Sequence, residues 1–338
     1  MKILQKYGRE KTVHIILTAL VCILLLGLPM VIDSSYILFL MLQVFINIII
    51  IQGLNIITGL TGQMHFGTGA IFSIGAYTSA IITTRLGVSP WIGMLAAIIM
   101  GWIVGKVLGY PGLKVKGVYL WLITIAFNQV VNVLEKNLTG LTGGTQGIKG
   151  IPYFSIFGFT FRSNQSMYYL YLAFTAIAVL LAMRIVHSRW GRLFRAVRDN
   201  EEAMRSNGID DSSVKILAFT ISTMYACFAG ALYSHAFTYI TPSAFADLST
   251  NYLVMMMIGG IGSIPGSSIG AALITLLPEM MRSLQQYYWL IFSSVTLLMT
   301  IFWPQGIISL FHADFWQTTL RKIKSKKERI EYGDHIET

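Results

Sequence analysis

The sequence predicts an all-α polytopic membrane protein with about ten transmembrane helices. Hydrophobic residues make up 54% of the 338 residues and charged residues only 12%, whereas a soluble protein of average composition carries roughly 25% charged residues. The mean hydropathy is +0.64. One soluble core cannot bury that much apolar surface, so much of it must face lipid. The distribution of lysine and arginine along the chain supports the same fold class.

Ten apolar stretches are candidates for the membrane helices, and a helix needs ~20 residues to cross the hydrocarbon core. They lie at residues 13–32, 36–57, 64–83, 90–109, 118–135, 167–187, 214–238, 248–261, 267–284 and 287–310. The eighth and ninth are short, so we expect broken or short helices there. The first follows a basic start, as in a signal peptide, but it is long and lacks an A-x-A-like cleavage site. We expect it to be an uncleaved helix.

Lysine and arginine gather on one side of this predicted arrangement. With the N-terminus inside, the segments on the cytoplasmic side hold 20 of the 25 basic residues. Such an excess of positive charge in cytoplasmic segments places both termini in the cytoplasm. The net charge of +10 is thereby explained by topology, and no nucleic-acid partner is expected.

The chain is expected to form one transmembrane domain over residues 1–311, followed by a basic cytoplasmic tail at 312–338. The two long connections are a cytoplasmic loop at 188–213 and an extracytoplasmic loop at 136–166. Glycines recur at the helix contacts and turns. Two turns of similar sequence, Gly59-Leu-Thr-Gly62 and Gly259-Gly-Ile-Gly262, each open a helical hairpin in a different half of the chain.

The sequence carries no signature of catalysis, of a metal site or of a cofactor. It contains no GxxxxGK[ST] phosphate-binding loop, and its six histidines are scattered without metal-ligand spacing. Gly266-Ser-Ser-Ile-Gly270 matches the GxSxG nucleophile elbow, which requires a strand before it and His and Asp partners. Here the motif opens an apolar helical hairpin, so we interpret its small residues as permitting close helix contact.

Polar side chains line one side of two apolar stretches. At 100° per residue, Thr124, Asn128, Asn132 and Glu135 fall within about 80° of one another. In the second apolar stretch, Gln43, Asn47 and Asn55 likewise share one side. Such groups are costly against lipid, so they are expected to face the helix bundle or water. Two interpretations stay open: hydrogen bonds between helices, or the lining of a route for a polar solute. The candidate pathway-lining residues are Asn47, Asn55, Gln63, Thr124, Asn128, Gln129 and Asn132.

The cytoplasmic segment from Ser188 to Gly208 has strong helix-capping signals. Asp199 is expected to cap a short helix, with Glu202 as its capping-box partner and Gly208 as its end. The residues from Asp210 to Ser213 are expected to cap the next membrane helix. The segment is interpreted as a docking helix for a cytoplasmic partner. The alternative is a solvated basic loop that only serves the charge asymmetry.

Several motifs, in order over about residues 45–311, resemble the LivM-type permease family of branched-chain amino acid ABC importers. They are Gly53-Leu-Asn55, Gly59-Leu-Thr-Gly-Gln63, Phe66-Gly67, Ile74-Gly-Ala-Tyr77, Gly117-Val-Tyr-Leu120, Thr142 to Gly147, Ser188 to Gly208, Phe228 to Tyr233, Tyr239 to Pro242, Ile258 to Ser263, Tyr287 to Leu290 and Pro304-Gln-Gly306. Met64-His65 departs from the family's usual small or apolar pair.

The resemblance implies the type II, vitamin B12 importer-like fold and transport of leucine, isoleucine or valine across the inner membrane by alternating access. The implied partners are a second permease subunit, two cytoplasmic ATPase subunits and an extracytoplasmic substrate-binding protein. The residues implied to form the ATPase-coupling loop are Arg192, Arg195, Arg198, Asp199, Asn200, Glu201, Ala203 and Gly208. Urea or short amides remain alternative substrates. A self-powered secondary carrier or a lipid-modifying membrane enzyme remain alternative functions.

Overall fold

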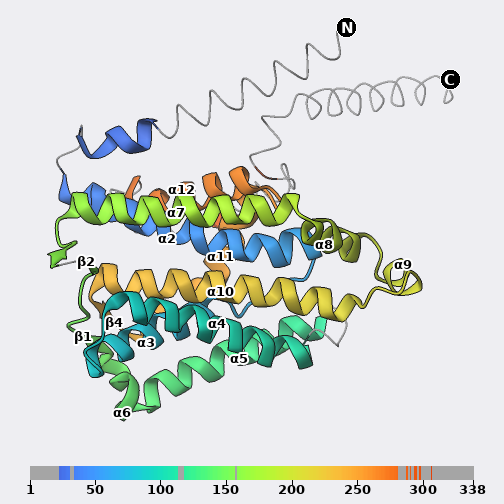
Figure 1. Cartoon of the computed structure of the whole chain (residues 1–338), viewed down its shortest axis with the longest axis horizontal. Coiled ribbons are helices and arrows are strands. Elements are labelled where there is room, and N and C mark those ends of the chain that lie inside the picture. Colours follow the sequence, from blue (N-terminus) through green and yellow to red (C-terminus); the bar gives the residue numbers. More distant parts are fainter. Residues whose placement is uncertain are drawn as a thin grey trace, which may run out of the picture.

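The computed structural model describes residues 23–30, 34–112, 118–156 and 158–280, together with residues 287, 290, 293, 294, 297 and 306. Long helices lie roughly side by side in one bundle (Figure 1). The two helices of the 188–213 segment, α8 and α9, lie at one end of that bundle. The short strands and α6 lie at the opposite end. The bundle therefore has two distinct ends, separated by the length of its helices.

The first half of the described chain is a series of helices joined by short turns. Its elements are α2 (Ser35–Leu54), the π-helix η1 (Asn55–Leu60), α3 (Thr68–Arg85), α4 (Pro90–Gly112), α5 (Val118–Asn137), α6 (Thr139–Thr142) and the 3₁₀ turn η2 (Gly144–Gln146). η1 continues α2 without a break, so the last turn of this helix is wider than the rest. π-helical turns of this kind often mark functional positions.

The second half begins with the strands and ends with a helical hairpin. Its elements are β1 (Ile148–Lys149), β2 (Ser155–Ile156), β3 (Phe159–Thr160), α7 (Asn164–His187), α8 (Arg189–Asp199), α9 (Glu201–Ser206), α10 (Asp211–Phe237), β4 (Tyr239–Ile240), the 3₁₀ turn η3 (Pro242–Phe245), α11 (Leu248–Gly259) and α12 (Ile264–Met280). β1 pairs antiparallel with β4, and β2 with β3.

These helices cover eight of the ten apolar stretches that the sequence predicts. The stretches at 13–32 and 287–310 lie largely outside the described residues. Among the described helices, four are long and apolar enough to cross a membrane: Ser35–Leu60, Pro90–Gly112, Asn164–His187 and Asp211–Phe237. The eighth and ninth stretches form the short helices α11 and α12, of 12 and 17 residues. The chain is thus a mostly helical, multi-pass membrane protein.

α10 is the centre of the bundle and packs against α2, α3 and α4. Glycines make these contacts close. A Cβ atom at Gly230 of α10 would lie 2.0 Å from the carbonyl oxygen of Phe72 in α3, and one at Gly105 of α4 would lie 2.7 Å from the Cα of Thr220. Backbones that approach this closely gain van der Waals contact, which holds helices together where lipid is as apolar as the side chains.

The outer helices show the opposite pattern. In the most apolar 18-residue stretches of α4 and α7, only 33% and 22% of the residues are buried, against 67% for α2 with η1 and 72% for α10. Leu180 and Leu181 of α7, for example, are 61% and 52% exposed. A helix that covers other helices while presenting leucine outward is suited to face lipid.

We predict that Gly230→Ala destabilises the bundle, because the added methyl overlaps the backbone of α3. Overpacking of this kind costs about 1–3 kcal/mol, so the detergent-solubilised protein should unfold at a lower temperature. Gly140→Ala is the matched control, because no atom lies within 4 Å of the methyl it would add. Equal melting temperatures for the two variants would contradict the close α3–α10 contact.

Candidate functional site

α8 is an amphipathic helix held against the end of the bundle. The side chain of Ser188 caps it by accepting hydrogen bonds from the backbone N–H groups of Trp190 and Gly191. Phe194 and Val197 are 0% and 1% exposed, and α8 packs on α7, α10 and η1. The opposite face carries Arg192, Arg195 and Asp199, all exposed. A charged stripe is therefore presented outward by a helix whose other face is fixed in the bundle.

α9 begins one residue later than the sequence analysis predicts. Asn200, and not Asp199, is the N-cap, and its side-chain oxygen accepts a hydrogen bond from Ala203 N–H at 3.0 Å. Asp199 is instead the last residue of α8, because the chain leaves that helix only at the extended backbone of Asn200 (φ −164°, ψ 104°). The predicted capping box with Glu202 is consequently wrong.

Other local predictions for this segment hold. α9 ends at Ser206, and Gly208 follows in the left-handed region with φ +76°, which glycine adopts without strain. Asp210 caps α10 by accepting hydrogen bonds from the N–H groups of Ser212 and Ser213. The Ser213 hydroxyl and these N–H groups hold the pKa of Asp210 below its usual range. The cap is therefore ionised at neutral pH and well placed at the positive end of the helix dipole.

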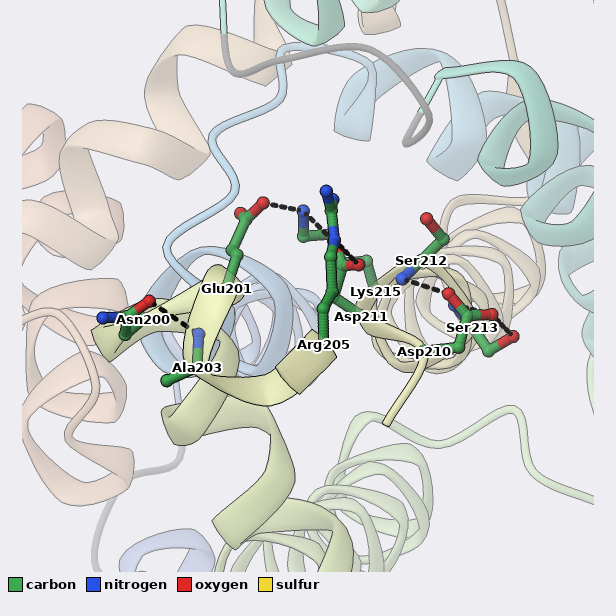
Figure 2. A network of polar contacts seen from close by, with 9 residues as sticks. All are labelled: Asn200, Glu201, Ala203, Arg205, Asp210, Asp211, Ser212, Ser213 and Lys215. Carbon is green, nitrogen blue, oxygen red and sulfur yellow. Dashed lines mark hydrogen bonds and ion pairs between the residues drawn. The ribbon is translucent and has the colours of Figure 1, made fainter. Parts of the chain in front are cut away.

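A charged network joins α9 to the start of α10 (Figure 2). The Lys215 ammonium lies 2.7 Å from a Glu201 carboxylate oxygen and 3.0 Å from one of Asp211. Arg205 donates two hydrogen bonds to Asp211, at 2.6 and 2.9 Å. The side chains of Lys215 and Asp211 are only 7% and 3% exposed, so their charges depend on each other. The network fixes the short helix α9 relative to the long helix α10.

Arg198 ties α8 to the interior of the bundle. Its guanidinium donates a 2.7 Å hydrogen bond to the carbonyl oxygen of Gly59, near the end of η1. In the same place, the Asn55 side-chain oxygen accepts a 2.7 Å hydrogen bond from Gly262 N–H, in the turn between α11 and α12. A Cβ at Gly59 would lie 2.7 Å from the nitrogen of Gly262. We call these residues, Asn55, Gly59, Arg198 and Gly262, the junction.

The junction brings together the two glycine turns that the sequence analysis singles out. Gly62 and Gly262 both have positive φ, at +72° and +86°. The atom nearest to a Cβ at Gly62 would be one of Arg198, 3.2 Å away. Side chains at these positions would be strained and would crowd the arginine. Three separate parts of the chain, η1, α8 and the α11–α12 turn, thus meet through backbone atoms, the side-chain amide of Asn55 and the guanidinium of Arg198.

A cavity of about 400 Å³ lies beside the junction, between α8–α9 and the turn that follows η1. Gln63, Met64, Arg198 and Glu201 are among its lining residues. It contains groups of both charges and a side-chain amide, and it lies at the end of the bundle that carries α8. Of the candidate pathway residues, Gln63 is the one located here.

Three candidate pathway residues hydrogen-bond between helices or to a neighbouring turn. Asn47 donates to the Thr275 hydroxyl at 2.8 Å, and Asn55 donates to the Ser267 hydroxyl at 3.3 Å. The first bond joins α2 to α12, and the second joins η1, the continuation of α2, to α12. The Thr124 hydroxyl accepts from Phe66 N–H at 3.0 Å and holds the entry to α3 against α5. These contacts match the first of the two interpretations, hydrogen bonding between helices.

The amides of α5 behave differently. Asn128 and Asn132 are partly exposed and Gln129 is exposed, and the side chains of all three make no hydrogen bond with any described residue. Glu135, on the same side of α5, is buried and accepts a hydrogen bond from Ser73. The structure therefore does not gather the seven candidate residues in one place. Gln63 lies by the junction, Asn47 of α2 and Asn55 of η1 lie against α12, Thr124 holds the entry to α3, and the three α5 amides are partly or fully exposed.

Sequence reasoning missed the charged network and the role of Gln52. Lys215 and Asp211 stand one helical turn apart at the start of an apolar helix, a spacing that allows an ion pair and could have identified them. Gln52 interrupts an apolar run and donates a 2.8 Å hydrogen bond to the Ser268 hydroxyl. An isolated glutamine in such a run signals an interhelical bond, but it does not say which helix supplies the partner.

We predict that Asp211→Asn loosens α9 from α10 and destabilises the protein by about 3 kcal/mol, because removing one partner of a buried pair leaves the other charge uncompensated. Thermal unfolding in detergent measures the loss. Adding Lys215→Met to Asp211→Asn should restore part of it. Asp247→Asn is the control, since Asp247 is exposed and makes no cap hydrogen bond. If both aspartate variants melt alike, the network does not stabilise this segment.

Comparisons with known proteins agree on one family. The family described as branched-chain amino acid transport system, permease component, matches residues 36–301. The LivM permease protein of the high-affinity branched-chain amino acid transport system of Escherichia coli K12 is 30% identical over 289 residues, covering 78% of this chain and 68% of the relative.

More distant relatives extend the comparison. A probable LivM protein of Methanocaldococcus jannaschii is 25% identical over 223 residues, covering 62% of this chain and 63% of the relative. The LivH permease protein of Escherichia coli K12 is 23% identical over 275 residues, covering 76% and 89%. No solved structure matches the chain significantly. The chain belongs to the family of branched-chain amino acid transport system permease components.

Proposed function

We propose that this chain is the LivM-type membrane subunit of an ATP-driven importer that carries leucine, isoleucine and valine by alternating access. It is a transport subunit and not an enzyme. The names of its relatives support the substrate class. The observation that carries the coupling part of the proposal is α8, whose inner face is buried in the bundle and whose outer face is a charged stripe. The sequence contains no phosphate-binding loop of its own, so ATP hydrolysis belongs to a partner.

The proposed complex contains this chain, a second permease subunit, two cytoplasmic ATPase subunits and an extracytoplasmic substrate-binding protein. In the membrane, the chain forms about ten helices of the type II importer fold, with both termini in the cytoplasm. The permease domain spans residues 1–311 and the cytoplasmic tail residues 312–338. The asymmetry of lysine and arginine supports this orientation, because it puts the loop 188–213 inside and the loop 136–166 outside. The membrane is the inner, or plasma, membrane.

The coupling-loop residues divide into two groups in this proposal. Arg192, Arg195 and Asp199 form the outward stripe and contact the ATPase, and Arg195 also donates a 3.3 Å hydrogen bond to the carbonyl oxygen of Val186 in α7. The others shape and anchor the loop: Arg198 reaches Gly59, Asn200 caps α9 through Ala203, Glu201 bonds Lys215, and Gly208 turns the chain toward α10. ATP binding draws the two ATPase subunits together, and the anchored helix α8 passes their movement to η1 and to the α11–α12 turn.

The α5 amides are proposed to line the solute route where this chain meets the second permease subunit. Asn128, Gln129 and Asn132 have no hydrogen-bonding partner among the described residues, and lipid would not solvate them. A water-filled interface between the two subunits would bring water and a polar solute to these groups. Asn47, Asn55 and Thr124 support the walls of that route by holding helices together, and Gln63 lies at its cytoplasmic end.

We predict that Arg192→Glu with Arg195→Glu lowers leucine uptake at least about tenfold, equivalent to 1.4 kcal/mol or more of lost interaction. Reversing two charges of the stripe puts like charges together at any surface that fits the native stripe. Uptake of radiolabelled leucine into cells that carry the whole transporter measures the effect, with membrane insertion checked by immunoblot. Lys106→Glu is the control, an exposed charge reversal on the same proposed side of the membrane.

Omission of the ATPase subunits tests the function as a whole. Uptake by the complete transporter should disappear without them. Transport that persists would identify a self-powered carrier, and uptake of urea in preference to leucine would replace the proposed substrate.

A further inference from the structure

A second cavity, of about 170 Å³, lies inside the described part of the chain, in the half of the bundle far from α8. α2, α3, α10, η3, α11 and α12 contribute its lining. In the proposed orientation this is the extracytoplasmic half. At ~30 Å³ for each water molecule in the liquid, the cavity has room for roughly six waters or one small solute. None of its described lining residues belongs to α5, so it is distinct from the interface proposed beside that helix.

One wall of the cavity is an aromatic cluster. The ring of Phe72 packs edge-to-face on those of Tyr233 and Tyr252, with centroids 5.4 and 5.9 Å apart. Phe245 completes the cluster behind them, 5.7 Å from Phe72. Such pairs hold one another in a fixed orientation. Met255 and Ile274 add aliphatic surface. The cavity thus offers a stiff apolar wall to whatever enters it.

Four lining residues, two of them in the aromatic wall, carry polar groups without a hydrogen-bonding partner among the described residues. Gln43, Tyr233, Asn251 and Tyr252 line the cavity, and their side-chain amides and hydroxyls make no hydrogen bond with any described residue. Tyr252 is buried, and the other three are partly buried. By contrast, Asn47 and Thr275, which also line it, are bonded to each other at 2.8 Å. Polar groups left unpaired in an apolar bundle cost free energy, so native proteins satisfy them with water or a ligand. Four such groups in one small cavity indicate a binding site.

The chemistry of the lining defines the ligand. None of the described lining residues is Asp, Glu, Lys or Arg, so a solute of net charge would be buried without compensation. A zwitterion is neutral overall. Each side-chain amide has a carbonyl oxygen, which accepts from an ammonium, and an NH₂ group, which donates to a carboxylate. An aliphatic side chain would lie on the aromatic wall.

We propose that this cavity is a transient binding site for one aliphatic α-amino acid, with Gln43 and Asn251 bonding its charged ends and Phe72, Tyr233 and Tyr252 contacting its side chain. This proposal rests on the proposed transport function and adds a site where the permease itself contributes to selectivity. A lipid acyl chain fits the observations less well, because it would leave all four polar groups unsatisfied.

Ala244 lines the cavity, whereas Ala246, two residues further on, does not. Both are exposed in the described structure, so they form a matched pair. In a transporter with Cys22 and Cys227 replaced by serine and alanine, each position receives a single cysteine. We expect saturating leucine to slow the reaction of Ala244→Cys with a small methanethiosulfonate reagent about tenfold, as for a site largely occupied by ligand. The reaction of Ala246→Cys should not change.

Two further measurements test whether the protection is specific to a neutral aliphatic amino acid and to this cavity. Arginine and glutamate, which carry net charge, should not slow the reaction at Ala244→Cys. Adding Asn251→Leu to Ala244→Cys should raise the leucine concentration needed for protection by about tenfold, the effect of losing 1.4 kcal/mol of binding. Absence of protection by leucine, or equal protection by all three amino acids, would overturn the proposal. A slow reaction at Ala244→Cys both with and without leucine would also overturn the proposal, because it would show that lipid occupies the cavity permanently.

Parallel uptake measurements separate this proposal from the proposed function. If the complete transporter imports leucine but leucine does not protect Ala244→Cys, only the cavity assignment fails. If the complete transporter does not import leucine at all, the proposed function fails. Ala244→Trp should fill the cavity and lower leucine uptake while ATPase subunits still assemble with the chain, whereas Ala246→Trp should not.

Discussion

The hydrogen bond from Arg198 to the carbonyl oxygen of Gly59 is the contact on which the rest of this structure depends. It joins a loop helix to a backbone group inside the bundle, and a hydrogen bond from a charged donor is worth about 1.5–3 kcal/mol. Asn55 extends the contact to Gly262, so that α8, η1 and the α11–α12 turn share one set of bonds. Side chains at Gly59 or Gly62 would break this arrangement. α8 is consequently part of the bundle and more than a flexible connection between two membrane helices.

The helix pair α2 and α12 links the junction to the inner cavity. These helices run antiparallel: Asn55 bonds Ser267 near the junction, and Asn47 bonds Thr275 at the cavity. The two bonds lie eight residues apart on each helix, which is about 12 Å. In the proposed mechanism, a displacement of α8 moves the ends of both helices through Asn55 and Gly262. The same displacement then changes the shape of the cavity whose walls those helices form, and this couples the ATPase side to the solute.

Much of the fold follows from the sequence, and the failures have physical causes. The apolar runs predict where eight described helices lie, and Asp210 predicts a cap that the structure contains. The sequence predicts the cap of α9 at Asp199, whereas the structure has it at Asn200. Both residue types cap helices and they are adjacent, so only the length of α8 decides between them. Periodicity identifies Asn47 and Asn55 as facing inward, but it cannot name Thr275 or Gly262 as their partners, more than 200 residues away. The inner cavity was missed for the same reason, since its lining comes from six separate elements.

The central claim is that the junction transmits movement from the loop helix to the bundle, and the ratio of leucine imported to ATP hydrolysed tests it most directly. In proteoliposomes that contain the complete transporter, Arg198→Met removes the hydrogen bond to Gly59 and leaves the outward stripe of α8 intact. The account predicts continued ATP hydrolysis with about tenfold less leucine imported per ATP, a loss of 1.4 kcal/mol in coupling, and little further loss when Asn55→Ala is added, because contacts in one network are not additive. An unchanged ratio in the Arg198→Met transporter would contradict the account.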